Sequence, residues 1–139
     1  MTINELEKRR TELLEELSHI GDMRSGTISV RYQRCSKSPC ICQSPNHPGH
    51  GPIYSLSMLV NGKTKMKNYR PGPELAKVEL EVESYKRYRK LSQALVAVSN
   101  AICDLRKTPE VTDADELESL KKKLEKKFKK KLEKKSTRL

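Results

Sequence analysis

Residues 35–52 read Cys-Ser-Lys-Ser-Pro-Cys-Ile-Cys-Gln-Ser-Pro-Asn-His-Pro-Gly-His-Gly-Pro, and this stretch decides how the chain folds. Three cysteines and two histidines fall within sixteen residues, and most residues between them favour turns. Because the stretch has almost no apolar side chains, it cannot build a core of its own. A Zn²⁺ ion bound by four Cys and His side chains would hold such a loop in place. The sequence therefore predicts a structural zinc site.

The predicted ligands are Cys35, Cys40, Cys42 and His50. His47 competes for the fourth position, but His50 lies between two glycines, which leave the backbone free to turn its imidazole inward. A disulfide is the alternative, and a bridge between Cys40 and Cys42 would close a short, strained ring. The N-terminus is polar and acidic rather than a secretory signal, which favours a reducing, cytoplasmic setting.

These residues resemble a known family. The run from Cys35 to Cys42, followed by Gly49-His50-Gly51-Pro52, is similar to small prokaryotic domains of unknown function with the pattern C-G-K-x-G-C-x-C and then G-H-G-P-Y-x-x-L. The resemblance covers about residues 24–95 and implies a Gly-rich hairpin followed by a long helix. Members of the family look like cargo of mobile-element-rich genomes. The resemblance supports the metal site and the architecture, and it says little about activity.

Two helices are predicted on either side of this region. Thr2 and Glu5 form a capping box that opens a helix running to about Met23, with apolar residues at alternating three- and four-residue steps. Pro73 suits the first turn of a second helix that runs to about Lys107 with a similar apolar seam. Because both helices join the sheet at their near ends, we expect an antiparallel coiled-coil stalk.

Three strands are predicted between the helices. Residues 26–34 alternate between apolar and polar side chains, a second strand begins at Pro52, and a third ends at about Tyr69. Asn61-Gly62 signals the hairpin between the last two strands. A two-residue loop would put three lysines on the apolar face, so we predict a three-residue loop that pairs Leu59 with Lys63 and turns the lysines outward.

The predicted fold class is therefore α+β. A zinc-stapled, three-stranded antiparallel sheet and its two-helix stalk occupy residues 1–107, and a linker with a basic C-terminal helix occupies residues 108–139. Asp113 is expected to cap that last helix. Cys103 is expected to be a small apolar filler on the long helix.

The formal net charge of +11 is unevenly distributed. Residues 24–70 contain eight basic and no acidic residues, and residues 121–139 contain eleven basic and two acidic residues. Solubility alone does not require such a long stretch without acids, so the pattern indicates two anion-binding surfaces. We predict nucleic-acid binding, and we favour duplex DNA over RNA because the outer sheet face lacks aromatic residues that stack on unpaired bases.

The predicted nucleic-acid contacts are basic residues on the head, on the near end of the long helix and on the C-terminal helix. They are Arg31, Arg34, Lys37, Lys63, Lys65, Lys67, Arg70, Lys86, Arg87, Lys121, Lys122, Lys123, Lys126, Lys127, Lys129, Lys130 and Lys131.

The sequence also bears on other functions. A catalytic zinc needs an open position beside a general base, and residues 35–52 contain no carboxylate, so we expect neither an enzyme nor a small-molecule substrate. The main alternative is a structural or adaptor protein whose helices form a homodimer or bind a helical partner. A third possibility is that the C-terminal helix lies on an anionic membrane, although the chain has no apolar run long enough to cross one.

Overall fold

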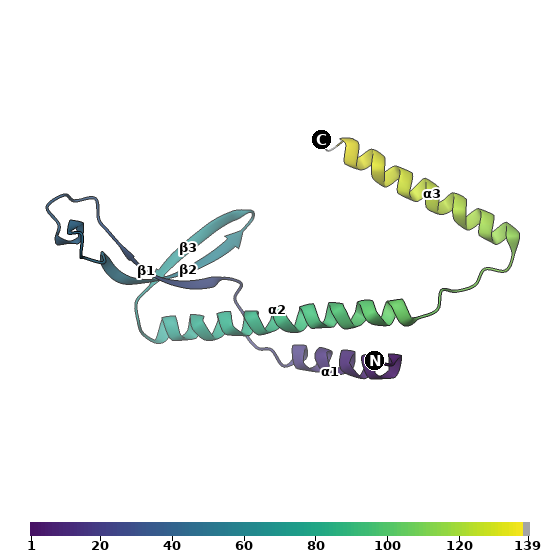
Figure 1. Ribbon diagram of the computed structural model, residues 1–139, viewed down its shortest axis with the longest axis horizontal. Coiled ribbons are helices and arrows are strands. Elements are labelled where there is room, and N and C mark those ends of the chain that lie inside the picture. Colours follow the sequence, from purple (N-terminus) through teal and green to yellow (C-terminus); the bar gives the residue numbers. More distant parts are fainter. Residues whose placement is uncertain (138–139) are drawn as a thin grey trace. The chain divides into compact units, whose positions relative to one another are not determined.

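The computed structural model describes residues 1–137, and residues 138–139 at the end of the predicted C-terminal segment lie outside the description. The elements are α1 (Ile3–Ser18), β1 (Thr27–Gln33), a short 3-10 turn (Ile41–Gln43), β2 (His50–Val60), β3 (Lys63–Tyr69), α2 (Pro73–Leu105) and α3 (Ala114–Thr137). The strands form one antiparallel sheet in the order β1-β2-β3 (Figure 1). The predicted α+β class is confirmed. Contacts divide the chain into two compact units, residues 1–105 and a second beginning at Arg106.

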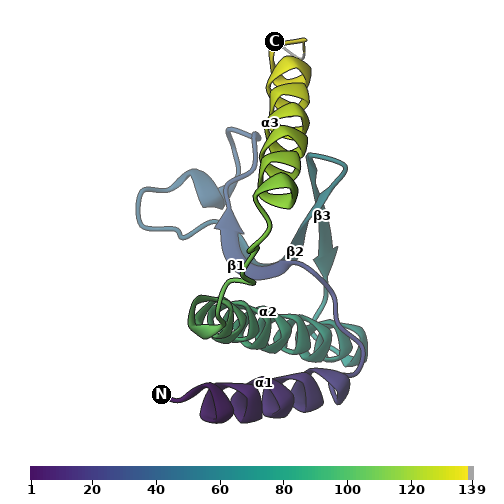
Figure 2. The ribbon, with the colours of Figure 1, turned by 90° about the vertical axis from the view of Figure 1, so that its right-hand side faces the viewer.

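The first unit has three layers, with α2 between α1 and the sheet (Figures 1 and 2). The two helices run antiparallel, and Leu6 and Leu13 of α1 are buried, as are Leu91 and Ile102 of α2. The sheet packs on another face of α2, through residues such as Val82. These buried residues belong to the apolar seams predicted from the sequence, whereas Leu105 at the end of the α2 seam is exposed. Supercoiling of the helix pair stays a prediction.

Helix α1 begins with the predicted capping box and ends earlier than predicted. The backbone N–H of Glu5 donates to Thr2 Oγ1 over 3.2 Å, and the N–H of Thr2 donates to Glu5 Oε2 over 2.8 Å. The helix stops at Ser18 rather than near Met23. The physical reason is tertiary: the chain must cross from α1 to the sheet, and the backbone N–H of Arg24 donates to a carbonyl of α2 instead of continuing the helix.

The hairpin register differs from the predicted one. Val60 pairs with Lys63 and Met58 pairs with Lys65, so the loop has two residues, Asn61 with φ 51° and Gly62 with φ 78°. These positive φ values are those of a type I′ turn, which matches the twist of paired strands. The predicted three-residue loop is therefore wrong, and the β3 lysines share the face of the sheet that carries the apolar residues of β2.

The lysines nevertheless remain in water, because helix α2 does not cover their strand. The small core under the sheet contains Leu56, Val78 and Val82, and only Tyr69 at the end of β3 packs against it. Every residue from 63 to 68 is exposed. Figure 1 shows the β2–β3 hairpin projecting away from α2. The desolvation cost that argued against this register is therefore never incurred.

The second unit contains the basic helix α3. Asp113 caps it as predicted: the backbone N–H of Asp115 donates to Asp113 Oδ1 over 2.9 Å. The apolar stripe of α3, from Leu117 to Leu132, is exposed within this unit. No helix among the described residues is both long and apolar enough to cross a bilayer.

Candidate metal centre

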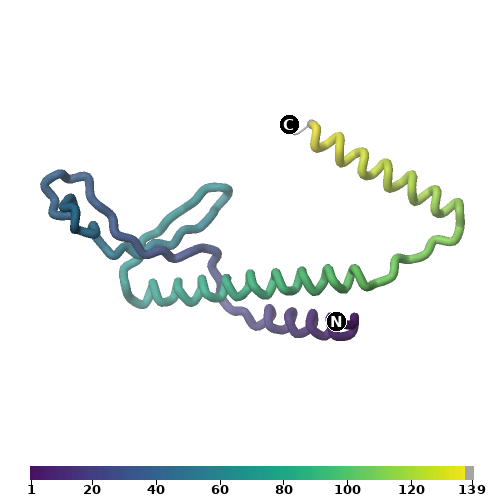
Figure 3. Tube along the Cα trace, in the orientation of Figure 1, coloured from purple at the N-terminus to yellow at the C-terminus, as the bar shows by residue number. Residues whose placement is uncertain are grey.

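The predicted ligands lie on a loop that leaves the sheet at the end of β1 and returns at the start of β2 (Figure 3). The last pair between these strands joins Gln33 to His50, after a register shift that begins at Arg31. Because Cys35 follows Gln33 by two residues, this pairing brings the first cysteine near the histidine. The 3-10 turn at residues 41–43 then folds Cys42 back toward Cys35.

The structure brings the four predicted residues together. Cys35 Sγ lies 3.4 Å from Cys42 Sγ, and Cys40 Sγ lies 3.2 Å from His50 Nε2. All four ligand atoms lie within 4.8 Å of one another. A disulfide would place two sulfur atoms about 2.05 Å apart, whereas tetrahedral zinc with typical bond lengths places its ligand atoms about 3.5–3.8 Å apart. The geometry therefore fits a shared metal ion, and three thiolates with one imidazole are a donor set that Zn²⁺ accepts.

Hydrogen bonds favour the ionised form of one thiol. The Cys42 backbone and then the Cys42 and Cys35 side chains lower the pKa of Cys40 from 9.0 to about 6. Burial acts in the other direction on Cys42, whose side chain is fully buried and whose pKa is raised. The backbone N–H of Cys35 lies 3.3 Å from Cys42 Sγ and can donate to a thiolate there. A bound cation would offset the cost of burying that charge.

Two glycines are required beside His50. Gly49 and Gly51 have φ values of +106° and +142°, which side chains rarely adopt. A Cβ atom at Gly51 would also lie 2.9 Å from the backbone oxygen of Arg31, and one at Gly49 would lie 3.0 Å from the backbone of Gln33. The close approach of β1 therefore needs glycine on both sides of the histidine.

The second histidine lies outside the ligand cluster. His47 Nδ1 accepts a hydrogen bond of 3.0 Å from the backbone N–H of Gly49, and its ring centroid lies 6.3 Å from that of His50. The geometry thus assigns His50 to the cluster and gives His47 a place in the turn that precedes it.

Sequence reasoning missed the residues that brace the loop. The Arg34 guanidinium donates to the carbonyl oxygens of Ser44 over 3.2 Å and His47 over 2.9 Å. The Gln43 side-chain amide donates to the carbonyl of Cys35. Arg34 had been predicted to contact nucleic acid, and nothing in its sequence context pointed to carbonyls ten and thirteen residues away.

The other predicted nucleic-acid residues do not form one surface. Arg31 lies opposite Ile53, on the face of the sheet away from the β3 lysines. Lys86 is paired with Glu83 over 3.3 Å, and Arg87 lies 4.0 Å from Glu16. The exposed remainder comprises Lys37, Lys63, Lys65, Lys67 and Arg70 in the first unit and Lys121, Lys122, Lys123, Lys126, Lys127, Lys129, Lys130 and Lys131 in the second. The lysines were expected on the outer face of the sheet, and this expectation is wrong, because the two-residue loop reverses the faces of β3.

Cys103 also departs from its prediction. It lies on α2, as expected, but its side chain is exposed rather than packed in the core.

Fold and site together define a small α+β protein with a candidate Cys₃His metal centre. The chain belongs to the DUF6788 family, a domain of unknown function that matches residues 3–78. The resemblance to a domain of unknown function is thereby confirmed. The matched region includes α1 and ends in the first turns of α2, whereas the resemblance placed it at about residues 24–95. No curated protein and no solved structure matches the chain.

Proposed function

We propose that the protein is a zinc-containing, non-enzymatic nucleic-acid-binding protein whose β2–β3 hairpin contacts duplex DNA. The observation that carries this proposal is the row of exposed lysines at positions 63, 65 and 67, all on one face of an uncovered strand. No acidic residue interrupts the sequence from residue 24 to residue 70. A Zn²⁺ ion held by Cys35, Cys40, Cys42 and His50 would fold the adjoining loop.

The shape of the hairpin supports contact with a DNA groove. The major groove admits a two-stranded β-ribbon, and several DNA-binding proteins use strands in this way. Alternate residues of a strand lie about 6.8 Å apart, close to the rise of two base pairs along one DNA strand. Lysines at every second position are therefore spaced to follow a phosphate backbone.

Two of the three lysines are free to bind an anion. Lys67 lies 3.4 Å from Glu74 and stands over the Tyr69 ring at 5.0 Å, although an ion pair this exposed is weak. Lys63 and Lys65 have no ion-pair or hydrogen-bond partner within residues 1–137. These two residues are consequently the ones to test.

Helix α3 adds a second cationic element. The segment from residue 121 to residue 139 contains eleven basic and two acidic residues, which would attract any polyanion without reading its sequence. In this proposal α3 raises affinity for DNA in general, and the hairpin carries any preference for groove shape or sequence. A link to mobile elements stays a prediction from the family resemblance.

The test is a salt series of fluorescence anisotropy titrations with duplex DNA, single-stranded DNA and structured RNA. Replacing both Lys63 and Lys65 by alanine should reduce the slope of log K against log salt by about 1.8 for duplex DNA, since each lost phosphate contact removes about 0.9. The matched control replaces Lys8 and Lys107, two exposed lysines outside the hairpin, and removes the same charge. Equal slopes for the two variants would refute contact through the hairpin.

Deleting residues 121–139 separates the two cationic elements. The shortened protein should bind all duplexes more weakly and with a flatter salt dependence, yet it should keep any preference among unrelated sequences. If the shortened protein does not bind at low salt while the hairpin variant binds normally, α3 alone accounts for the affinity and the hairpin has no part in it.

A structural or adaptor role is the second candidate, and exposed apolar residues on the helix pair favour it. Leu14 is 51% exposed on α1, and Leu80 and Val96 are 71% and 58% exposed on α2. Pairing of two copies, or of one copy with a helical partner, would cover such residues. We therefore expect a dimer at micromolar concentration in sedimentation velocity. A monomer that binds DNA with a steep salt slope would exclude self-association as the function of these helices.

A further inference from the structure

A second candidate site lies where the chain enters the sheet, between the hairpin and α2. It is a pocket of 460 Å³. Ser25, Gly26 and Thr27 contribute from the start of β1, and Tyr85 and Arg89 contribute from α2. Hairpin residues complete the lining: Ser57, Met58, Leu59 and Thr64. The strand register brings the hydroxyl-bearing residues together, because Thr27 pairs with Ser57 and Leu59 pairs with Thr64.

The lining suits an anion. The lining residues include one arginine, Arg89, and five residues that carry hydroxyl groups: Ser25, Thr27, Ser57, Thr64 and Tyr85. In the described part of the chain, no acidic side chain lines this pocket. A guanidinium group donates two parallel hydrogen bonds to a phosphate, and serine and threonine hydroxyls donate to its remaining oxygens. The volume lies within the range of about 300–1,000 Å³ typical of small-molecule sites, so a phosphate could enter together with the group it is attached to.

Arg89 has no partner, unlike three of the basic residues near it. Lys86 lies 3.3 Å from Glu83, Arg87 lies 4.0 Å from Glu16, and Arg24 lies 3.2 Å from Glu81. Among residues 1–137, Arg89 forms neither an ion pair nor a hydrogen bond. Its charge is therefore available to a ligand, whereas the charges of Arg24, Lys86 and Arg87 are partly neutralised.

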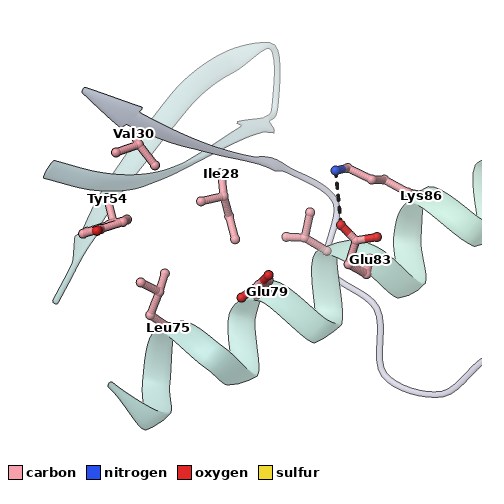
Figure 4. A pocket seen from close by; sticks show the side chains of 8 residues that line it. Ile28, Val30, Tyr54, Leu75, Glu79, Glu83 and Lys86 are labelled. Carbon is pink, nitrogen blue, oxygen red and sulfur yellow. Dashed lines mark hydrogen bonds and ion pairs between the residues drawn. The ribbon is translucent and has the colours of Figure 1, made fainter. Parts of the chain in front are cut away.

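Another pocket at the junction of the sheet with α2 provides a contrast. This pocket of 270 Å³ is lined by apolar residues such as Ile28, together with Glu79, Glu83 and Lys86 (Figure 4). The lysine there is bound to Glu83, so the pocket has an excess of acidic groups. Two pockets between the sheet and α2 thus carry opposite charge, and of these two only the one with Arg89 fits an anion.

We propose that the Arg89 pocket binds a phosphate group. The proposal deepens the proposed function, on which it rests for the source of the phosphate, namely the backbone of a nucleic acid held by the hairpin. Met58 lines this pocket and also an adjoining one that contains Lys65 and Lys67. The register places Thr27, Ser57 and Thr64 on the face opposite the lysines, so the two pockets adjoin at Met58 without sharing one cationic surface. A nucleic-acid backbone that follows the lysines would pass close to Arg89 there.

The test uses the full chain loaded with Zn²⁺ and three probes: inorganic phosphate, a dinucleotide with or without a 5′-phosphate, and a DNA duplex. Binding is followed by NMR shifts at residues 25–27 and 57 and by anisotropy for the duplex. Arg89→Ala should weaken phosphate and dinucleotide binding about 10- to 100-fold, the range for losing charged hydrogen bonds. Arg87→Ala is the matched control, since it removes the same group from the same helix at a position near α1.

The probes distinguish the sources of the phosphate. If Arg89→Ala weakens binding of both dinucleotides and of the duplex, the ligand is a phosphate within a nucleic-acid backbone. Loss confined to inorganic phosphate and the 5′-phosphorylated probe supports a terminal phosphate in the same pocket. Unchanged binding of every probe in Arg89→Ala, or equal losses in Arg87→Ala, overturns the proposal. Because Lys63 and Lys65 are tested separately, a negative result for the Arg89 pocket leaves the proposal that the hairpin contacts DNA unaffected.

A second variant tests whether weaker phosphate binding could result from a loss of folding. Thr27→Val removes one pocket hydroxyl while keeping a β-branched side chain suited to a strand, and it should weaken phosphate binding less than Arg89→Ala. Normal helix content in both variants, measured by circular dichroism, assigns the loss to the pocket. A Thr27→Val protein that binds inorganic phosphate as tightly as the unchanged chain counts against hydroxyl contacts in the site.

Discussion

Replacing Cys42 by serine removes the most buried member of the metal cluster. Its side chain is fully buried, its sulfur lies 3.4 Å from that of Cys35, and the backbone N–H of Cys35 lies 3.3 Å away. Serine is close in size, but its hydroxyl does not ionise near neutral pH and is a poor zinc ligand. The variant should therefore lose metal affinity without a large change in packing volume.

The expected loss can be worked out from the ligand number. Structural zinc sites bind with apparent free energies of about 10–16 kcal/mol at pH 7. Shared among four ligands, this is about 3–4 kcal/mol for each, or about a 100- to 1,000-fold change in the dissociation constant. The loop has little else to hold it, because Cys42 and Gly49 are its only buried residues between positions 34 and 50. Metal loss should therefore release this loop, while Leu13 and Ile102 keep the helix pair packed.

Two measurements together test this reasoning. Competition with a chromophoric chelator gives the zinc dissociation constant, and hydrogen exchange read by mass spectrometry locates the change along the chain. Exchange should accelerate within residues 34–50 and stay slow in peptides from α1 and from the second half of α2. Cys103→Ser is the matched control, because Cys103 is exposed on α2 outside the cluster. Wild-type zinc affinity in the Cys42 variant, or faster exchange spread evenly over both helices, would refute the assignment.

The other predictions concern His50 and Arg34 at the metal centre and Glu81 on α2. His50→Ala should weaken zinc binding more than His47→Ala in the chelator assay, since only the imidazole of His50 lies in the ligand cluster; equal losses would contradict the assignment. Arg34→Ala should lower zinc affinity about 10- to 100-fold, as for other groups that orient ligands. Arg34→Lys should not restore the affinity fully, because one ammonium group cannot replace a guanidinium group that donates to two carbonyl oxygens. Unchanged affinity in Arg34→Ala would show that the brace is dispensable. The hydrogen bond from Lys77 lowers the pKa of Glu81 below its ordinary 4.5. Ionised Glu81 therefore stabilises the folded state above pH 4.5, and this stability is lost as the pH falls through the pKa of Glu81 in the folded protein. Thermal melts from pH 7 to pH 3 should therefore show a steeper fall in Tm for the wild type than for Glu81→Gln, and parallel curves would contradict the pairing.

Local sequence signals determined the site and the helix starts. The spacing of Cys35, Cys40 and Cys42 and the two glycines around His50 are features of one short segment, which the pairing of β1 with β2 closes. The capping box of α1 and the start of α2 at Pro73 depend on local geometry in the same way. The caps can be predicted because their interacting groups lie within a few residues of one another, and the ligand set can be predicted because all four residues lie in one sixteen-residue segment.

Only the tertiary structure decided which part of the sheet is buried and which is exposed to solvent. A lysine on the apolar face of a sheet is buried only where a helix covers that face, and the alternation of residues along a strand does not show where such a helix lies. Helix α2 packs on Leu56 in the middle of the sheet and leaves β3 in water, so the two-residue turn at Asn61-Gly62 costs no buried charge. The hydroxyl of Ser55, which donates to Asn68 over 2.6 Å, also holds this register. The coverage of a strand depends on where a distant helix lies, and that position is set by contacts between segments that no local pattern of residues specifies.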